Sequence, residues 1–259
     1  MILNWKNILI PYEQAVDELK VKFKSIRNGY KMANKYSPIE FVTGRVKEIS
    51  SILDKARKLG VSLDQIEEGI EDIAGIRIMC QLVEDIDKVV ELIRSRDGKD
   101  LNIVYEKDYI TNIKESGYRS YHIIIKYIVH TAIGEKEILA EIQIRTLAMN
   151  FWATIEHSLN YKFKYNIPKD IRIRLKNAAE AAFLLDQEMS EIRDEIVDAQ
   201  GMFRARSSII AEALSKIQKL YFTEKADDIE EIEKEFWELK DSGKYKELES
   251  FIEKLNKML

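Results

Sequence analysis

The sequence predicts an α+β fold, in which a mixed β-sheet of about five strands is flanked by helices and followed by a C-terminal helical extension. Three observations carry this prediction. Helical spacing dominates the first 70 residues, β-compatible apolar segments dominate residues 73–145, and helical spacing returns after Thr146. Helices and strands that segregate along a chain, rather than alternate, are typical of α+β domains. A chain of 259 residues can bury one substantial core.

The part of the chain before the sheet is expected to form three helices, and prolines are expected to separate the segments. The first helix spans about residues 11–28. A second is expected over about 38–59, because Ser37-Pro38-Ile39-Glu40 has the pattern of a capping box with proline at the first helical position. Gly60 suits the C-terminal end of that helix, and a short third helix is expected to end at Gly69.

Four later segments have the composition of strands, with a helix over residues 85–96 between the first two. The strands are expected at Ile73–Leu82, Leu101–Ile110, Tyr121–Thr131 and Glu137–Arg145. The last two are joined by Ala132-Ile133-Gly134-Glu135, which predicts a hairpin.

Helical spacing continues from Thr146 to about Lys162, from Pro168 to about Ala199, and again over about residues 202–222. The tail, residues 223–259, carries 12 acidic and 7 basic residues and keeps its apolar residues at helical spacing. An acidic amphipathic tail of this kind is expected to pack on its own domain or on a partner subunit. We therefore divide the chain into a sheet-containing domain, 1–167, and a helical extension, 168–259, which we expect to serve oligomerisation.

The overall composition excludes several classes of protein. With 41 basic and 45 acidic residues the net charge is −4, which is not the uniform basicity of a non-specific nucleic-acid binder. No apolar run is long enough to span a bilayer, and the N-terminus lacks the layout of a signal peptide. The single cysteine, Cys80, excludes an internal disulfide and a cysteine-cluster metal site, and we expect it to be a buried, inert thiol. We predict a cytoplasmic protein without membrane contact.

The strand that includes Glu141, Gln143 and Arg145 places these three polar side chains on one face, because side chains alternate along a strand. An acid, an amide and a guanidinium in a row could bind a phosphorylated ligand that also forms hydrogen bonds. The alternative is a half-exposed strand with one solvated face.

Asp72 stands where the first strand of the sheet begins, so a second carboxylate on another strand, such as Glu141, could hold Mg²⁺ together with it. That ion usually binds one or two carboxylates plus substrate phosphates. The alternative for Asp72 is an ordinary turn or helix-terminus acid. Arg77 lies inside an apolar strand, where an arginine needs a partner.

Two more basic patches have ordinary alternatives. Near the turn at Gly117, Lys114 and Tyr118 could bind phosphate and stack on a purine base, or could be part of an edge strand with ordinary aromatic packing. Arg45 and Lys47, two apart in a predicted helix, do not share a helical face, so a solvated basic surface is the alternative there.

The three histidines form no histidine–histidine or histidine–aspartate pair, which argues against a histidine-metal hydrolase site. The sequence also lacks a Walker-type phosphate loop and a kinase signature.

Taken together, the motifs resemble the synthetase domain of the RelA/SpoT family, and the nucleotidyltransferase-like fold of that domain is then expected. The resemblance spans about residues 40–165, and several motifs occur in the family's order. They are Arg45-Val46-Lys47, Asp72-Ile73-Ala74-Gly75-Ile76-Arg77, Gly117-Tyr118-Arg119-Ser120-Tyr121-His122, Glu141-Ile142-Gln143-Ile144-Arg145-Thr146, and Trp152-Ala153 to Glu156-His157. The short chain is similar to the stand-alone small alarmone synthetases, in particular the RelQ-like branch.

The resemblance implies transfer of the pyrophosphate of ATP to the 3′-hydroxyl of GDP or GTP, which gives ppGpp or pppGpp and AMP. It implies that Asp72 and Glu141 hold Mg²⁺ and that Glu141 chiefly accepts the hydroxyl proton. For the ATP site it implies Arg45 and Arg77 on adenine, and Lys47, Lys55 and Arg57 on the triphosphate. For the GDP/GTP site it implies Tyr118 on guanine, Gln143 and Asn150 toward the nucleotide, and Lys114, His122 and Arg145 on its phosphates or ribose.

The resemblance also implies partners. Relatives assemble as homotetramers with a central alarmone-binding cleft, and some bind single-stranded RNA. The long relatives carry a hydrolase domain with a His-Asp motif, which does not occur in this sequence, so we expect synthesis without hydrolysis. Two alternatives are a nucleotide- or RNA-binding regulator on a synthetase-like fold, and a different nucleotidyltransferase on the same sheet.

Overall fold

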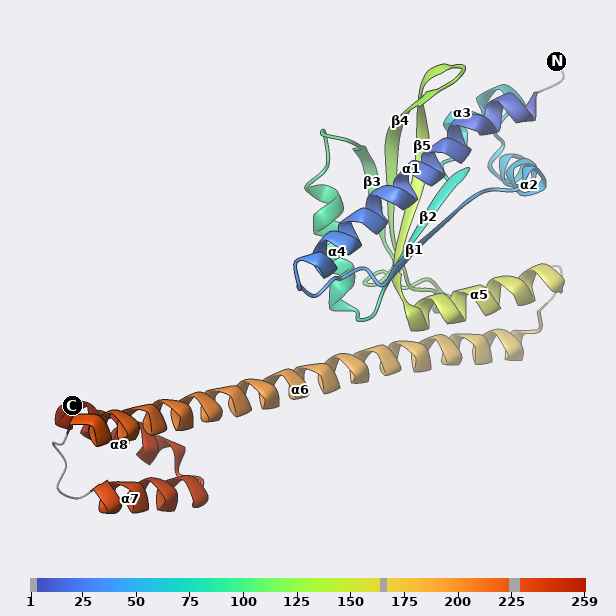
Figure 1. Ribbon diagram of the computed structural model, residues 1–259. Helices are drawn as coiled ribbons and strands as arrows, with labels where there is room; N and C mark the ends of the chain where they lie inside the picture. Colours follow the sequence, from blue (N-terminus) through green and yellow to red (C-terminus); the bar gives the residue numbers. More distant parts are fainter. Residues whose placement is uncertain (1–3, 164–166, 224–228) are drawn as a thin grey trace. The chain divides into compact units, whose positions relative to one another are not determined.

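The computed structural model describes residues 4–163, 167–223 and 229–259 (Figure 1). Its strands form one five-stranded sheet in the order β1-β2-β5-β4-β3. The strands are β1 (Phe41–Val46), β2 (Ala74–Cys80), β3 (Asn102–Asp108), β4 (Tyr121–Thr131) and β5 (Gly134–Thr146). Only β2 and β5 pair in parallel among these strands, and the other neighbours are antiparallel. The predicted α+β fold with a mixed sheet is therefore confirmed.

Strand β1 replaces the first part of a predicted helix, so the expectation of one helix over 38–59 is wrong. Ser37 Oγ bonds within its own turn, to the amide and the carbonyl of Ile39, and caps no helix. Residues 41–46 instead pair antiparallel with β2, a non-local interaction that overrides the local capping pattern. Only α2 (Ile49–Leu59) is helical in this region, and it ends at Gly60 in the left-handed conformation, as predicted.

One face of the sheet packs against helices α1 (Trp5–Met32) and α4 (Glu84–Arg94) (Figure 1). Leu19 and Phe23 of α1 are fully buried in one core with Ile76 of β2 and Ile142 of β5. Strand residue Gly44 lets α1 approach closely, because a Cβ there would lie 2.9 Å from the Cδ1 atom of Ile76 and 3.0 Å from the Cγ1 atom of Val16. The opposite, polar face carries Arg77, His122, Glu141, Gln143 and Arg145 beside the buried apolar side chains of Met79 and Ile124.

The ends of several other helices differ from expectation. Pro11 lies inside α1 and is buried there, so this proline does not separate two segments. A 3₁₀ turn (Leu63–Gln65) leads into the short α3 (Ile66–Gly69), and α5 (Leu147–Lys162) follows β5 directly.

Helix α6 (Lys169–Thr223) is continuous, so the predicted break between Ala199 and residue 202 is wrong. A single glycine, Gly201, costs a helix interior only about 1 kcal/mol relative to alanine, and its neighbours are good helix formers. Within the described ranges, no helix is long and apolar enough to cross a membrane.

The chain forms two compact units, Met1–Ser190 and Glu191–Leu259. The second unit contains the end of α6 together with α7 (Ile229–Asp241) and α8 (Tyr245–Met258). Its own core is built from buried apolar residues of all three helices: Ile217, Leu220, Phe236, Leu248, Phe251 and Leu255. The amphipathic tail thus packs within its own unit. The functional division at residues 167 and 168 stays a prediction.

The part of α6 up to Ser190 belongs to the sheet unit and is bound to the rest of that unit by several hydrogen bonds. Trp152 Nε1 of α5 donates to the carbonyl of Leu175 (2.8 Å), and Ser190 Oγ donates to Glu84 (3.1 Å). Between them, the hydroxyl of Thr146 at the end of β5 donates to the buried carboxylate of Asp186. Burial raises the pKa of Asp186 to about 6, with a further contribution from the charge of Glu84 and an opposing one from the Thr146 hydrogen bond.

The raised pKa of Asp186 predicts a pH-dependent stability. The folded state holds the proton up to about pH 6, whereas the unfolded chain releases it near pH 4. Stability is therefore lost as the pH rises through this window. Asp186→Asn keeps an acceptor for Thr146 and cannot ionise. We subtract the unfolding free energy of the wild type from that of Asp186→Asn, and we expect this difference to be about 1–2 kcal/mol higher at pH 8 than at pH 5.

Urea unfolding at the two pH values measures this difference. Asp198→Asn, on an exposed position of the same helix, is the matched control. An equal effect of Asp186→Asn at both pH values would contradict the assigned titration.

Candidate active site

The polar face of the sheet is assembled by strand register. Glu141 of β5 lies opposite Gly75 of β2, and Gln143 lies opposite Arg77 on one side and His122 of β4 on the other. Arg45 of β1 lies opposite Gly75 in turn. Because directly opposed residues point to the same side of a sheet, these side chains share the face that α1 does not cover. Residues far apart in the sequence thus meet on one surface.

The basic residues near Arg45 take a different geometry from the one expected. Arg45 lies on strand β1 and Lys47 follows that strand, so a spacing of two brings them to the same side, which a helix would not. Lys47 Nζ lies 2.7 Å from Oδ2 of Asp72, and Lys55 Nζ, from α2, lies 2.8 Å from Oδ1. Arg57 is not brought to this cluster, because it is exposed and pairs with Asp54 on its own helix.

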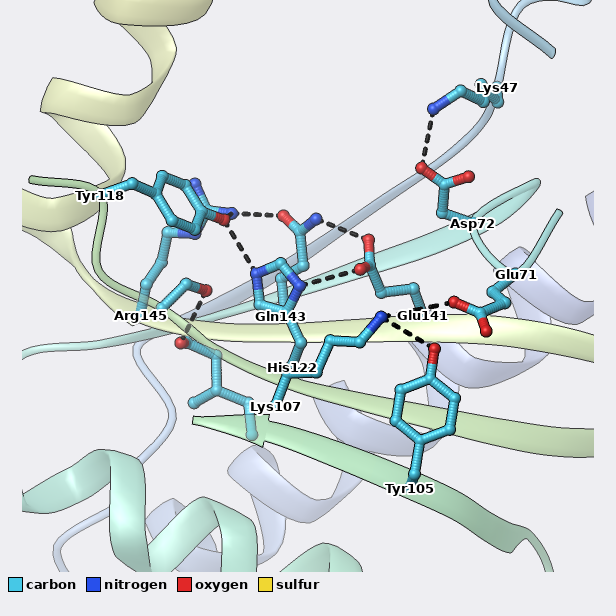
Figure 2. Close-up of polar contacts among 12 residues, drawn as sticks. Lys47, Glu71, Asp72, Tyr105, Lys107, Tyr118, His122, Glu141, Gln143 and Arg145 are labelled. Carbon is cyan, nitrogen blue, oxygen red and sulfur yellow. Dashed lines mark hydrogen bonds and ion pairs between the residues drawn. The ribbon is translucent and has the colours of Figure 1, made fainter. Parts of the chain in front are cut away.

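Five side chains close a ring of hydrogen bonds on the polar face (Figure 2). His122 Nδ1 lies 2.8 Å from Oε1 of Glu141, and Gln143 Nε2 donates to Oε2 of the same carboxylate at 2.7 Å. Arg145 donates to the Gln143 amide oxygen and, at 3.0 Å, to the hydroxyl of Tyr118. That hydroxyl lies 2.8 Å from Nε2 of His122, which completes the ring.

The ring fixes both oxygens of Glu141. Since an ionised carboxylate only accepts hydrogen bonds, Nδ1 of His122 must carry the proton between them. Burial alone would raise the pKa of Glu141, but the hydrogen bond and charge of His122, the Gln143 amide and the charge of Lys55 together lower it to about 2. The side chain is only 14% exposed. Glu141 is therefore a well-oriented, permanently ionised acceptor at neutral pH.

Two arginines face this surface without protein partners. Within the described residues, neither Arg45 nor Arg77 has a hydrogen bond or ion pair. Arg77 is half-buried, and its pKa is lowered by burial and by the charges of Arg145 and Arg45. An arginine in an apolar strand was expected to need a partner, and no such partner exists among the described protein groups. Both guanidiniums are thus available to a ligand.

Lys114 and Tyr118 lie together on the loop before β4. The ammonium of Lys114 lies 4.1 Å from the ring centre of Tyr109 and 4.9 Å from that of Tyr118. Burial lowers the pKa of Lys114 and raises that of Tyr118. Asn150 lies half-buried in the first turn of α5, directly after β5.

One group on this face was missed from the sequence. Lys107 of β3 lies opposite His122 in register, and its ammonium lies 2.9 Å from the Tyr105 hydroxyl and 3.6 Å from a carboxylate oxygen of Glu71 (Figure 2). The sequence contained a signal for this group, because Tyr105 and Lys107 are two residues apart on a segment correctly predicted as a strand and therefore share one face. Among the described residues, no three metal-ligating side chains of the types His, Cys, Asp and Glu gather in one place.

Both the sequence and the fold of this chain match known proteins. Residues 44–166 match the model of the region found in RelA / SpoT proteins. The chain is 58% identical to GTP pyrophosphokinase YjbM of Bacillus subtilis over 199 residues, which cover 77% of this chain and 93% of that protein. The chain belongs to the RelA/SpoT family. All predicted site residues, from Arg45 to Asn150, lie inside the segment that matches the family model.

Solved structures of RelA/SpoT members share the fold. A GTP pyrophosphokinase family protein from Streptococcus pneumoniae is 54% identical with a TM-score of 0.72, and covers 78% of this chain and 98% of its own. Small alarmone synthetase 1 from Bacillus subtilis, bound to its product pppGpp, is 58% identical with a TM-score of 0.70, and covers 74% and 97%. About a quarter of this chain has no counterpart in these relatives.

Proposed function

We propose that this chain is a GTP pyrophosphokinase. It transfers the β,γ-pyrophosphate of ATP to the 3′-hydroxyl of GDP or GTP, giving ppGpp or pppGpp and AMP. The observation that carries the proposal is the ionised carboxylate of Glu141, held on two sides and surrounded by cations on one open sheet face. The names of the relatives agree, since YjbM is called a GTP pyrophosphokinase and small alarmone synthetase 1 has been solved with pppGpp and with AMPCPP.

In this reaction the 3′-oxygen attacks the β-phosphorus in line, its bond to hydrogen breaks, and AMP leaves with the electrons of the former P–O bond. Positioning and charge stabilisation dominate such transfers, because the transition state is loose and needs little prior deprotonation of the nucleophile. Glu141 suits this demand as an oriented acceptor for the hydroxyl. Its low pKa makes it a weak base beforehand, so the proton moves to it late, as the new bond forms.

The ATP side lies on β1 and β2. Arg45 and Arg77 have no protein partners, and planar guanidiniums stack well on a base, which supports the adenine sandwich. Lys47 and Lys55 lie within 3 Å of Asp72 and are positioned for the triphosphate next to it. Arg57 would have to leave Asp54 to join them.

The GDP/GTP side lies on β4, β5 and the loop before β4. The hydroxyl of Tyr118 is held by His122 and Arg145, which fixes the ring proposed to stack on guanine. Gln143 and Asn150 would face the nucleotide, and Lys114, His122 and Arg145 would meet its phosphates or ribose. His122 also holds Glu141, so it would link the phosphate side to the reacting hydroxyl.

The carboxylates of Asp72 and Glu141 are oxygen ligands of the kind that Mg²⁺ prefers. Asp72 stands just before β2 and Glu141 lies opposite Gly75 of the same strand, so two carboxylates approach one surface. Lys47 and Lys55 neutralise Asp72 in this structure, and a divalent ion could replace that charge compensation. Bound there with the ATP phosphates, Mg²⁺ would withdraw charge from the β-phosphorus. For Glu141, the metal contact would be secondary to its contact with the hydroxyl.

The alternatives are less well supported. A non-catalytic nucleotide- or RNA-binding regulator on this fold would tolerate the loss of a catalytic carboxylate, and here both carboxylates are present and held in place. Binding of the alarmone product at a regulatory site and of single-stranded RNA remain predictions from the resemblance.

Glu141→Gln is predicted to abolish most of the synthesis. The amide cannot take the hydroxyl proton, so turnover should fall by about 10²- to 10⁴-fold. Chromatography of products from ATP plus GDP measures it: AMP release supports the proposed transfer, whereas pyrophosphate release indicates a different nucleotidyltransferase. Glu137→Gln, an exposed site on the same strand, is the control. Normal turnover by a folded Glu141→Gln protein would refute the assignment.

Asp72→Asn is predicted to weaken metal use. With one carboxylate charge removed, the Mg²⁺ concentration for half-maximal rate should rise about ten- to a hundredfold. Titrating the rate with Mg²⁺ after EDTA treatment measures this shift, and Asp87→Asn on the exposed side of α4 should leave the curve unchanged. An unshifted curve for Asp72→Asn would remove Asp72 from the metal site.

We also propose that the chain assembles as a homotetramer. One face of α5 exposes Leu147, Phe151 and Ile155, with exposed fractions of 44%, 68% and 42%, at a spacing of four residues that forms one apolar stripe. Sedimentation equilibrium of the wild type should give the mass of four chains, and Phe151→Asp should lower it. A monomeric wild type would contradict the proposal.

A further inference from the structure

The loop that carries Lys114 and Tyr118 rests directly on helix α6. Gly117 has a φ of +87°, and a Cβ atom there would lie 2.7 Å from the Cβ of Ala179 and 3.4 Å from the carbonyl oxygen of Lys176. Only glycine suits both the positive φ and the close approach. The amide of Gly117 also donates to the carbonyl of Lys114 at 2.8 Å, which closes the loop into a turn. The backbone of this loop therefore follows the surface of α6.

Arg119, the residue after Tyr118, anchors the same loop. Its side chain is only 4% exposed. One terminal nitrogen lies 2.6 Å from Oε2 of Glu180, and the other lies 3.4 Å from the carbonyl oxygen of Gly117 and 3.5 Å from that of Ala179. The guanidinium carbon lies 4.3 Å from the ring centre of Phe183. A single side chain thus binds the turn of its own loop and a stretch of α6.

This set of contacts requires a guanidinium. A planar fork can reach a carboxylate and two carbonyls at once while it stacks on an aromatic ring, whereas an ammonium is a compact point charge. Glu180 is the only carboxylate within ion-pair distance of Arg119 among the described residues, and a buried cation that loses its partner is strongly disfavoured. Glu180 itself is 57% exposed, so its replacement removes this charge without opening a cavity.

The contacts extend to the ring of Tyr118. It packs on the small cluster of Trp152, Ala153 and Ala179, which joins α5 and α6. Two consecutive residues are therefore held on α6, Tyr118 by packing and Arg119 by its ion pair. These two contacts act beside the hydrogen bonds of the Tyr118 hydroxyl with His122 and Arg145, and they tie the backbone of the loop to α6.

We propose that the Arg119–Glu180 pair is a positioning device for the guanosine nucleotide. This inference rests on the proposed function, which places Lys114 and Tyr118 on that nucleotide. The pair holds the loop in its binding-competent arrangement, and neither residue touches the reacting atoms. Apparent affinity falls in proportion to the competent fraction of the loop. Loss of the pair therefore weakens binding of GDP and leaves the ATP side, on β1 and β2, unchanged.

The test measures kcat and KM for GDP and for ATP in the full-length chain, with Glu180→Gln as the main variant. We expect KM for GDP to rise about three- to tenfold, with kcat and KM for ATP within about twofold. Glu188→Gln, an exposed glutamate two turns further along α6, is the matched control. Arg119→Lys should raise KM for GDP in the same direction, and in the double variant the two effects should be less than multiplicative, because both remove one contact.

Amide hydrogen exchange of residues 114–119 in the nucleotide-free protein gives a readout that is independent of turnover. Exchange there should be faster in Glu180→Gln than in the wild type, and unchanged in Glu188→Gln. A Glu180→Gln protein with wild-type KM for GDP and wild-type exchange overturns the inference. A fall in kcat at unchanged KM for GDP also overturns the inference, because it indicates a smaller fraction of active enzyme and not weaker binding of GDP. If the wild type makes no alarmone while exchange still responds, the proposed function fails and the anchoring of the loop stands.

Discussion

The parallel pairing of β2 with β5 is the constraint on which the site depends. It is the one parallel contact among the strands of the sheet, and it sets Gly75 opposite Glu141 and Arg77 opposite Gln143. Because side chains alternate across a sheet, a slip of one residue would turn Glu141 toward α1 and bring Ile142 to the polar face. Ile76 and Ile142, fully buried under α1, make such a slip costly. Burial on one face therefore fixes the chemistry of the other.

The polar face is a balance of charges. Glu141 keeps its negative charge in a nearly buried position because each of its oxygens accepts a hydrogen bond, one from His122 and one from Gln143, while further lone pairs stay available to a ligand. Two pairs of cations on the ATP side differ in their partners. Lys47 and Lys55 are neutralised by Asp72, whereas Arg45 and Arg77 have no partner among the described groups. In the proposed function the base of ATP would stack on these two guanidiniums and its phosphates would meet Lys47 and Lys55, and fixed charges of this kind need no rearrangement during the reaction.

The sequence alone was sufficient for β2 to β5, because each segment has a strong alternating or apolar pattern that is typical of a strand. It failed at β1. The segment Phe41–Val46 is short, includes a glycine and follows a convincing capping box, so its local sequence does not indicate a strand. Its strand conformation comes from pairing with residues 74–79. Because this segment was predicted as a helix, the side chains of Arg45 and Lys47 were predicted to lie on different faces. The continuity of α6 was missed for a related reason, since a single glycine is a weak stop signal when the neighbouring residues favour a helix.

The contacts of Arg119 show what no local pattern can reveal. Arg119 was part of a matching motif, yet nothing near it in the sequence identifies a partner 61 positions away on α6. Helical spacing after Pro168 predicted a helix, but not which of its faces meets the sheet unit. The compact unit that holds the sheet runs to Ser190, so the first turns of α6 belong to the structure that forms the site. Since Arg119 is buried and needs a charged partner, the loop and these turns of α6 are expected to order together. A helix that looks like an extension in the sequence thus holds the loop that carries Lys114 and Tyr118.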